Sequence, residues 1–427
     1  MLVNHADKES GSHGPEEAPT RTVLYDWHIK LTDKSHIASF AGYLMPLWYS
    51  SISAEHAAVR NAAGIFDCTH MGVLEVSDSG AEGFVDQLTT NSATALEVGC
   101  AQYSFVLGPS GDILDDVIVY RRASEEFMLV VNAANDAKMK SWIRSLLDDE
   151  VCIDPERPDR RICDRPRVRD LRAADCRADR RVDIAVQGPK SLEVLSALGE
   201  GKKPELHELR PFQFMETDIL GIECLVSRTG YTGARLGFEL FVHPDKASRL
   251  WEMILEAGEP LGVLPCGLGA RDSLRIEAGL PLYGHELAGP LDISAFEAGY
   301  GWAVKLDKEF FIGKAAMERR SKATDMTVAR IQLPGTKGIR PARQNDAVLD
   351  SHGRCIGWVL SCAVIDEKQT ALAYANRAYV QGNDTIGIYY SARSDRQIRQ
   401  GRKQNVEKGE LLESDLTGEV LSRFAKL

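Results

Sequence analysis

The chain has 427 residues, of which 44% are hydrophobic and 26% are charged, and it carries a formal net charge of −11. This length exceeds what a single hydrophobic core usually fills, so we expect two or three domains. A net negative charge argues against nucleic acid as the main partner, because nucleic-acid binding requires a clustered basic surface. Without an apolar run long enough to cross a bilayer, the sequence also argues against a membrane protein.

Residues 1–20 mix acidic side chains with Gly, Ser, Pro and His. They lack both the apolar stretch of a secretory signal and the Arg-rich, acid-poor composition of a transit peptide. We therefore predict a disordered tail and a cytoplasmic protein. The nine cysteines are scattered singly, without the close spacing of a zinc or redox motif, so we expect reduced packing cysteines and no metal site.

In the first three quarters of the chain, strand-like and helix-like segments alternate without a repeat. The predicted helices cover residues 52–63, 80–88 and 136–147, and the predicted strands cover 71–76, 103–107, 117–120 and 127–131. This irregular order is typical of an α+β fold rather than a doubly wound sheet. Glycine-rich loops of the kind that bind dinucleotides or phosphates are also missing from the sequence.

After residue 307 the chain changes to short β-like runs separated by Gly, Pro, Asp and Asn. They cover residues 328–333, 347–349, 355–361, 371–374 and 385–390. Such spacing predicts a small separate β-barrel or sandwich. The charged stretch 391–408 is expected to be exposed.

The first candidate site is the pair Asp115 and Asp116, at the entrance to an apolar strand. Adjacent strand residues point to opposite faces, so one carboxylate could face a pocket while the other caps the turn. Aspartates at turns also commonly bind backbone amides, and on this evidence alone that structural role is favoured.

A second candidate is the loop Arg228-Thr229-Gly230-Tyr231-Thr232-Gly233, followed by Glu239 in an apolar strand. A buried carboxylate requires a partner, and a ligand edge with two N–H donors, such as that of a pterin, would supply one. Alternatively, Glu239 faces outward from a half-buried strand, which strand alternation alone favours.

The third candidate is a helix that carries Arg271 and Arg275 four residues apart on one face. Paired arginines suit a carboxylate ligand, whereas internal pairing with Asp272 and Glu277 is an equally good interpretation. The histidines His70 and His285 do not accompany a nucleophile motif, and we expect packing or hydrogen-bonding roles for them.

Taken in order from residue 24 to 390, these segments resemble the aminomethyltransferase (T-protein) family of folate-binding proteins. The matching blocks include Phe40-Ala41-Gly42-Tyr43, Phe66-Asp67-Cys68-Thr69-His70, residues 111–119, Val131-Asn132-Ala133, Gln187-Gly188-Pro189, residues 228–233 and Phe311-Ile312-Gly313-Lys314. The strongest block is Cys266-Gly267-Leu268-Gly269-Ala270-Arg271-Asp272-Ser273-Leu274-Arg275.

The resemblance implies an α+β fold of three units arranged as a cloverleaf around a central channel. Two intertwined α+β lobes would form a folate-binding domain over residues 21–315, after the tail of residues 1–20. A C-terminal β-barrel would cover residues 316–400, and a charged tail would cover residues 401–427.

For the site, the resemblance implies that Asp115 is the catalytic residue that orients tetrahydrofolate. It implies that Glu239 and Arg271 bind folate, with Asn132 and Tyr231 lining the pocket. The implied reaction takes the aminomethyl group on the lipoyl arm of the H-protein of the glycine cleavage system. With tetrahydrofolate it gives methylenetetrahydrofolate, ammonia and dihydrolipoyl H-protein, mainly through orientation and charge placement.

Two departures from the family pattern stand out. The loop before Glu239 has Gly233-Ala234-Arg235-Leu236-Gly237 where the family has an acidic pair and one residue fewer, and the stretch 152–181 is longer and more charged. The main alternative function is a tetrahydrofolate-dependent demethylase on the same fold. A folate-binding protein of iron–sulfur assembly is a weaker alternative, because its Lys-x-Cys-x-Gly-Gln type segment is missing.

Overall fold

The computed structural model describes residues 18–198, 205–323, 325–335, 338–382 and 384–426. Most of the predicted disordered tail, residues 1–17, lies outside this part of the chain. The described chain forms two compact units. Unit 1 contains the residues up to Arg271 together with Ala303–Ala316, and unit 2 contains Asp272–Trp302 and Met317–Leu427.

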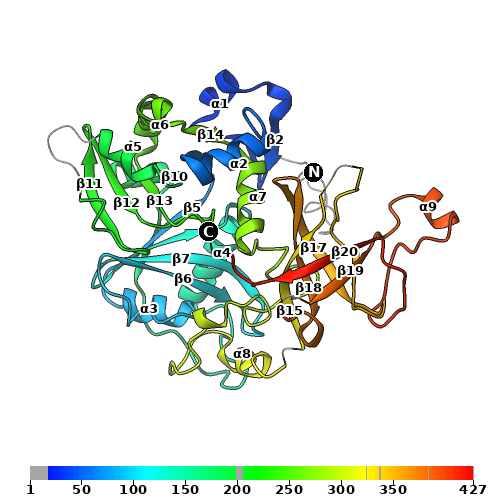
Figure 1. Cartoon of the computed structure of the whole chain (residues 1–427). Coiled ribbons are helices and arrows are strands. Elements are labelled where there is room, and N and C mark those ends of the chain that lie inside the picture. Colours follow the sequence, from blue (N-terminus) through cyan, green and yellow to red (C-terminus); the bar gives the residue numbers. More distant parts are fainter. Residues whose placement is uncertain (1–17, 199–204, 324, 336–337, 383, 427) are drawn as a thin grey trace. The chain divides into compact units, whose positions relative to one another are not determined.

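Unit 1 contains a six-stranded sheet in the order β11-β12-β13-β10-β4-β14 (Figure 1). All neighbouring strands are antiparallel except β14 and β4. The strands are β4 (Gly64–Asp67), β10 (Val182–Gln187), β11 (Phe214–Ile219), β12 (Ile222–Ser227), β13 (Gly237–Val242) and β14 (Leu264–Cys266). The helices α5 (Ser191–Ala197) and α6 (Pro244–Gly258) pack on one face through a core that includes the fully buried Trp251.

A second sheet of unit 1 has five strands in the order β6-β7-β8-β5-β9. They are β5 (Gly72–Ser77), β6 (Cys100–Leu107), β7 (Ile113–Ala123), β8 (Glu126–Val131) and β9 (Arg167–Asp170). The helices α3 (Ala81–Leu88) and α4 (Asp136–Leu147) cover one face, where apolar side chains of both helices pack against β7 and β8. This burial explains the apolar periodicity that predicted the two helices, and the α4 prediction is confirmed at both ends.

The uncovered faces of the two sheets pack against each other. Their shared core joins Tyr120 and Met128 of the five-stranded sheet to Leu225 and Phe241 of the six-stranded sheet. The Tyr120 ring meets Phe241 edge-on at 5.4 Å between centroids. Side chains on these two faces therefore meet inside unit 1, and polar groups there are shielded from water.

A short sheet, β1-β3-β2, precedes the larger ones; its strands are β1 (Thr20–Arg21), β2 (Ile37–Phe40) and β3 (Tyr43–Pro46). The helix α1 (Tyr25–Leu31) contacts β3, and the following helix α2 (Ile52–Asn61) packs against β4 and β14. Ser51 caps α2 by accepting a hydrogen bond from the backbone N–H of Ala54, which is a standard helix start.

Unit 2 contains a closed barrel in the order β15-β18-β17-β16-β19-β20. Its strands are β15 (Met326–Leu333), β16 (Ala347–Leu349), β17 (Cys355–Ile365), β18 (Lys368–Asn376), β19 (Thr385–Tyr389) and β20 (Leu416–Leu421). The remaining helices are α7 (Leu268–Ala278), α8 (Lys314–Arg320) and α9 (Asp395–Arg399). The α+β class and the C-terminal barrel are thus confirmed.

Two predicted boundaries require correction. Residues 401–427 are not only a charged tail, because β20 closes the barrel by pairing with β15 and β19. The high charge around it hid this strand, of which only Val420 is fully buried. In addition, Asp272–Trp302 groups with the barrel rather than with the predicted folate-binding domain. In the described residues, no helix has both the length and the apolarity that a membrane span requires.

Candidate active site

The two adjacent aspartates of β7 have different environments. Asp115 is completely buried on the face that α3 and α4 cover, whereas Asp116 is half-buried and lies on the face turned toward the six-stranded sheet. Strand alternation predicted opposite faces, and the helices decide which aspartate is enclosed. Asp116 is therefore the better placed of the two to contact a ligand between the sheets.

Amide groups hold the two carboxylates together. Asn132 donates from its backbone N–H and from its side chain to Asp115 at 3.0 and 2.8 Å, and its side chain also donates to Asp116 at 2.9 Å. Asn135 donates to Asp115 at 2.6 Å, and the Tyr103 hydroxyl donates to Asp116 at 2.9 Å. Asn132 thus lies at the predicted site and donates hydrogen bonds to both carboxylates.

The proximity of the carboxylates changes their acidity. Burial, followed by the charge of Asp116, raises the pKa of Asp115 to about 7, although the hydrogen bonds from Asn132 and Asn135 oppose this. Burial also raises the pKa of Asp116. Near neutral pH such a pair can hold or release one proton, which is a property of acid–base sites.

Glu239 lies on β13 and faces the shared core rather than open solvent. It is half-buried and accepts a hydrogen bond from the Thr229 hydroxyl, which in turn lies 3.3 Å from the Tyr120 hydroxyl. The outward-facing interpretation is therefore wrong. Burial raises the pKa of Glu239, and the Thr229 hydrogen bond and the charge of Arg271 partly offset that effect.

Arg271 extends from α7 and contacts groups from two other segments of unit 1. Its guanidinium donates to the Cys68 sulfur at 3.0 Å and lies over the Tyr231 ring at 5.1 Å from the centroid. The positive charge of Arg271 also opposes the rise in pKa that burial causes at Glu239 and at Asp183 of β10. The predicted residues Glu239, Arg271 and Tyr231 are thus brought together.

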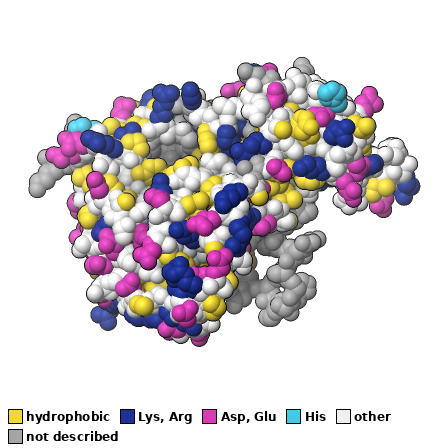
Figure 2. Space-filling view, turned by 90° about the horizontal axis from the view of Figure 1, so that it is seen from below, with side chains coloured by type: hydrophobic (Ala, Val, Ile, Leu, Met, Phe, Trp, Pro, Cys, Tyr) yellow, Lys and Arg dark blue, Asp and Glu magenta, His cyan; other side chains and the backbone are white. Residues whose placement is uncertain are grey.

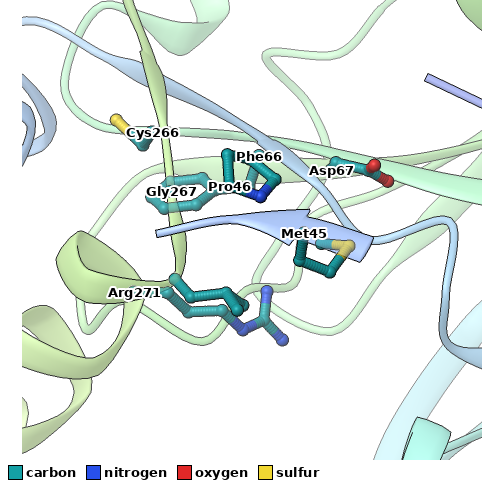
Figure 3. A pocket seen from close by; sticks show the side chains of 8 residues that line it. Met45, Pro46, Phe66, Asp67, Cys266, Gly267 and Arg271 are labelled. Atoms are coloured by element: carbon teal, nitrogen blue, oxygen red, sulfur yellow. The ribbon is translucent and has the colours of Figure 1, made fainter. Parts of the chain in front are cut away.

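A small pocket adjoins this arginine. Figure 3 shows the Arg271 side chain extending from α7 toward the side of the pocket where Met45 and Asp67 lie, with Cys266 on the other side. Glu55 fixes the start of α7 by accepting the backbone N–H of Gly267 at 2.8 Å. This contact positions the helix that carries Arg271.

Asp67, in the wall of the pocket, belongs to a buried chain of hydrogen bonds. His28 binds Asp67 at 2.7 Å through Nε2 and the Tyr49 hydroxyl at 2.8 Å through Nδ1. Burial would raise the pKa of Asp67, but the hydrogen bond and charge of His28 lower it to about 2. Asp67 is therefore an ionised carboxylate with its own partner.

Asp183 was not singled out from the sequence. It is only 2% exposed, and its Oδ1 atom has no hydrogen-bond partner among the described residues. In sequence it is one acidic residue at the start of an apolar strand, a position that normally faces solvent. Only the packing of the two sheets reveals its burial.

The other candidate residues are an arginine with acidic partners and two histidines with lowered pKa values. Arg275 pairs with Asp272 at 2.8 Å and with Glu286 at 2.6 Å, so for this arginine internal pairing is the correct interpretation. Burial lowers the pKa of His70 to about 4 and also lowers that of His285, which keeps both rings neutral. In the part of the chain that the structure describes, no cluster of His, Cys, Asp and Glu could hold a metal ion.

Comparison with known proteins shows the family of the chain. Residues 24–308 match the family model described as the GCVT N-terminal domain. The chain is 42% identical over 304 residues to an aminomethyltransferase of Alkaliphilus oremlandii, covering 71% of this chain and 75% of that protein. It is 35% identical over 372 residues to an aminomethyltransferase of Chlorobium phaeobacteroides, covering 86% and 93% of the two chains.

A solved structure shows the same similarity in three dimensions. The glycine cleavage system aminomethyltransferase T from Bartonella henselae superposes with a TM-score of 0.73 at 28% identity. The match covers 94% of this chain and 97% of that chain. With its carboxylates and Arg271 inside the matched segment, the chain belongs to the aminomethyltransferase family, the family of the glycine cleavage T-protein.

Proposed function

We propose that the chain is the tetrahydrofolate-dependent aminomethyltransferase of the glycine cleavage system. It would convert aminomethyl-lipoyl H-protein and tetrahydrofolate to methylenetetrahydrofolate, ammonia and dihydrolipoyl H-protein. One observation carries the proposal. Asp116 and Glu239 lie on the sheet faces that pack together, Asn132 links Asp116 to the enclosed Asp115, and Arg271 contacts Cys68, all within the segment shared with the family.

The polar groups present fit a reduced folate. Glu239 is half-buried and Asp183 has a buried oxygen without a partner, so both can accept N–H groups of a pterin ring. Arg271, stacked on Tyr231, offers donors to a carbonyl or carboxylate. When bound, tetrahydrofolate supplies N5 as the nucleophile that receives the one-carbon unit. The chain itself binds, orients and shields the reactants.

We assign different roles to the two aspartates of β7. Asp116 would contact the ligand and handle a proton, because it lies on the face between the sheets and binds Tyr103. The predicted catalytic residue Asp115 would act through Asn132, by fixing the position of the amide that also binds Asp116. The pKa of Asp115, raised to about 7 by burial and by the charge of Asp116, would allow the pair to accept or release one proton near neutral pH.

The lipoyl-bearing H-protein remains the proposed donor. Acidic and basic side chains are interspersed on the face shown in Figure 2. Several arginines of the charged stretch 152–181 are already paired with acidic residues, including Arg165 with Asp149 and Arg169 with Glu75. The proposal of H-protein as the partner therefore follows from the reaction, and the paired arginines of residues 152–181 do not favour this stretch as its docking surface.

Single-turnover transfer tests the function. Purified protein, tetrahydrofolate and aminomethyl-loaded H-protein should release ammonia and form methylenetetrahydrofolate only when all three are present. Omitting tetrahydrofolate or using H-protein without the aminomethyl group provides the controls. If tetrahydrofolate binds but no ammonia appears, the aminomethyl donor is wrong and the demethylase alternative gains support.

A further inference from the structure

Asp183 is a buried carboxylate whose partners within the protein are incomplete. It is 2% exposed, and its Oδ1 atom has no hydrogen-bond partner among the described residues. An unpaired buried carboxylate is costly, so it usually changes protonation state or takes a partner from a ligand. Burial and the charge of Glu239 both raise the pKa of Asp183 well above its usual range.

Strand register places Asp183 beside the proposed folate residues. In the β10–β13 pair, Ala185 is opposite Glu239 and Asp183 is opposite Phe241. Asp183 and Glu239 are therefore diagonal neighbours on one sheet face, at a distance of roughly 7–8 Å between backbones. That face is the one on which Phe241 packs against the five-stranded sheet.

The surrounding charges do not satisfy Asp183. Asp67 is occupied by His28, and Arg271 donates to the Cys68 sulfur. Burial keeps the Cys68 thiol protonated by raising its pKa. The charge of Arg271 acts on both Asp183 and Glu239, and within the described part of the chain the Oδ1 atom of Asp183 remains available to accept an N–H group of a ligand. Glu239 and Arg271 are half-buried, and Arg271 lines a small pocket with Asp67.

We propose that Asp183 is a second acceptor for the N–H edge of the reduced pterin ring, next to Glu239. This inference rests on the proposed function and adds a specificity residue to it. Glu239 would accept one N–H group of the ring, and the free Oδ1 of Asp183 would accept another. The pair would thereby select ligands that have adjacent N–H donors over analogues that lack one.

Two substitutions test the proposal: Asp183→Asn, which keeps the shape, and Asp183→Leu, which removes all polarity. We expect the dissociation constant for tetrahydrofolate, measured by calorimetry, to rise about 10- to 100-fold in Asp183→Leu. The rise should be smaller in Asp183→Asn, because the amide oxygen can still accept one N–H group. Without ligand, Asp183→Leu should raise the melting temperature by about 2–4 °C, because it removes an unpaired buried carboxylate. A merely structural aspartate would show the opposite change in stability.

Asp346→Asn provides the matched control, because Asp346 is also fully buried but binds Arg340, Arg393 and two backbone amides in the barrel unit. It should lower the melting temperature and leave folate affinity unchanged. Unchanged folate affinity in both Asp183 variants would overturn the proposal for Asp183 alone. If the unmodified protein fails to bind tetrahydrofolate, the proposed function itself is wrong.

Discussion

Two buried aspartates in this chain have opposite surroundings. Asp346 in the barrel unit accepts hydrogen bonds from the backbone of Arg343 and Ser391 and pairs with Arg340 and Arg393. Asp183 in unit 1 has an oxygen with no partner among the described residues. Both are completely enclosed or nearly so, yet only the barrel aspartate is satisfied by the protein itself.

The difference separates groups that stabilise the fold from groups available to a ligand. A buried charge that is fully paired holds loops to the barrel, and removing it is costly. A buried carboxyl group left without a partner lowers the stability of the free protein and is expected where a ligand completes the set. The Asp115–Asp116 pair lies between these cases, since amides satisfy Asp115 while Asp116 faces the packed sheets.

The largest expected effect is on catalysis. Asp116→Asn should reduce single-turnover transfer by about 10²- to 10⁴-fold, because the amide cannot accept a proton. The dissociation constant for tetrahydrofolate should change by less than about threefold, since the size and most hydrogen bonds remain. Rapid-quench measurement of ammonia release checks the rate, and calorimetry checks the affinity.

Asp115→Asn is the matched comparison for that experiment. It alters the enclosed carboxylate and should lower turnover less than Asp116→Asn does. If Asp115→Asn is the more damaging of the two at equal folate affinity, the roles assigned to the two aspartates must be exchanged.

The next largest effect is on stability. Asp346→Asn should lower the free energy of unfolding by about 3 kcal/mol, because Arg340 and Arg393 lose their shared anion. Chemical denaturation followed by the barrel tryptophan Trp358 measures this change. Turnover per folded molecule should stay unchanged, and a fall in turnover without loss of stability would contradict the separation of the two roles.

The smallest effect is on pH dependence. The hydrogen bonds from Asn132 lower the pKa of Asp115 and of Asp116, so Asn132→Ala should raise both. If turnover requires the ionised pair, it rises as pH increases through about 7 in the unmodified protein. In Asn132→Ala this rise should move to higher pH by up to about one unit.

A pH–rate profile from pH 5 to 9 measures the shift, with Asn61→Ala on the exposed side of α2 as the control. A shift toward lower pH would show that the carboxylates are not the titrating groups, because loss of a donor to an anion cannot favour the anion.

The sequence by itself determined the α+β class, about half of the described strands and the family. The helix over Asp136–Leu147 and the strand Ala347–Leu349 were predicted with the observed ends, because apolar periodicity and turn residues are local signals. The residues Glu239, Arg271 and Tyr231 were found through the resemblance, and the structure places them together.

Tertiary structure alone decided the burial and pairing of the acidic residues. Alternation put Asp115 and Asp116 on opposite faces, but only the packing of α3 and α4 enclosed Asp115 and left Asp116 toward the other sheet. In sequence, Asp183 is an ordinary polar residue at the start of a strand. Only the packing of the two sheets shows that it is buried and that its Oδ1 atom has no hydrogen-bond partner among the described residues. Burial and pairing depend on contacts between distant segments, which is why local patterns could not give them.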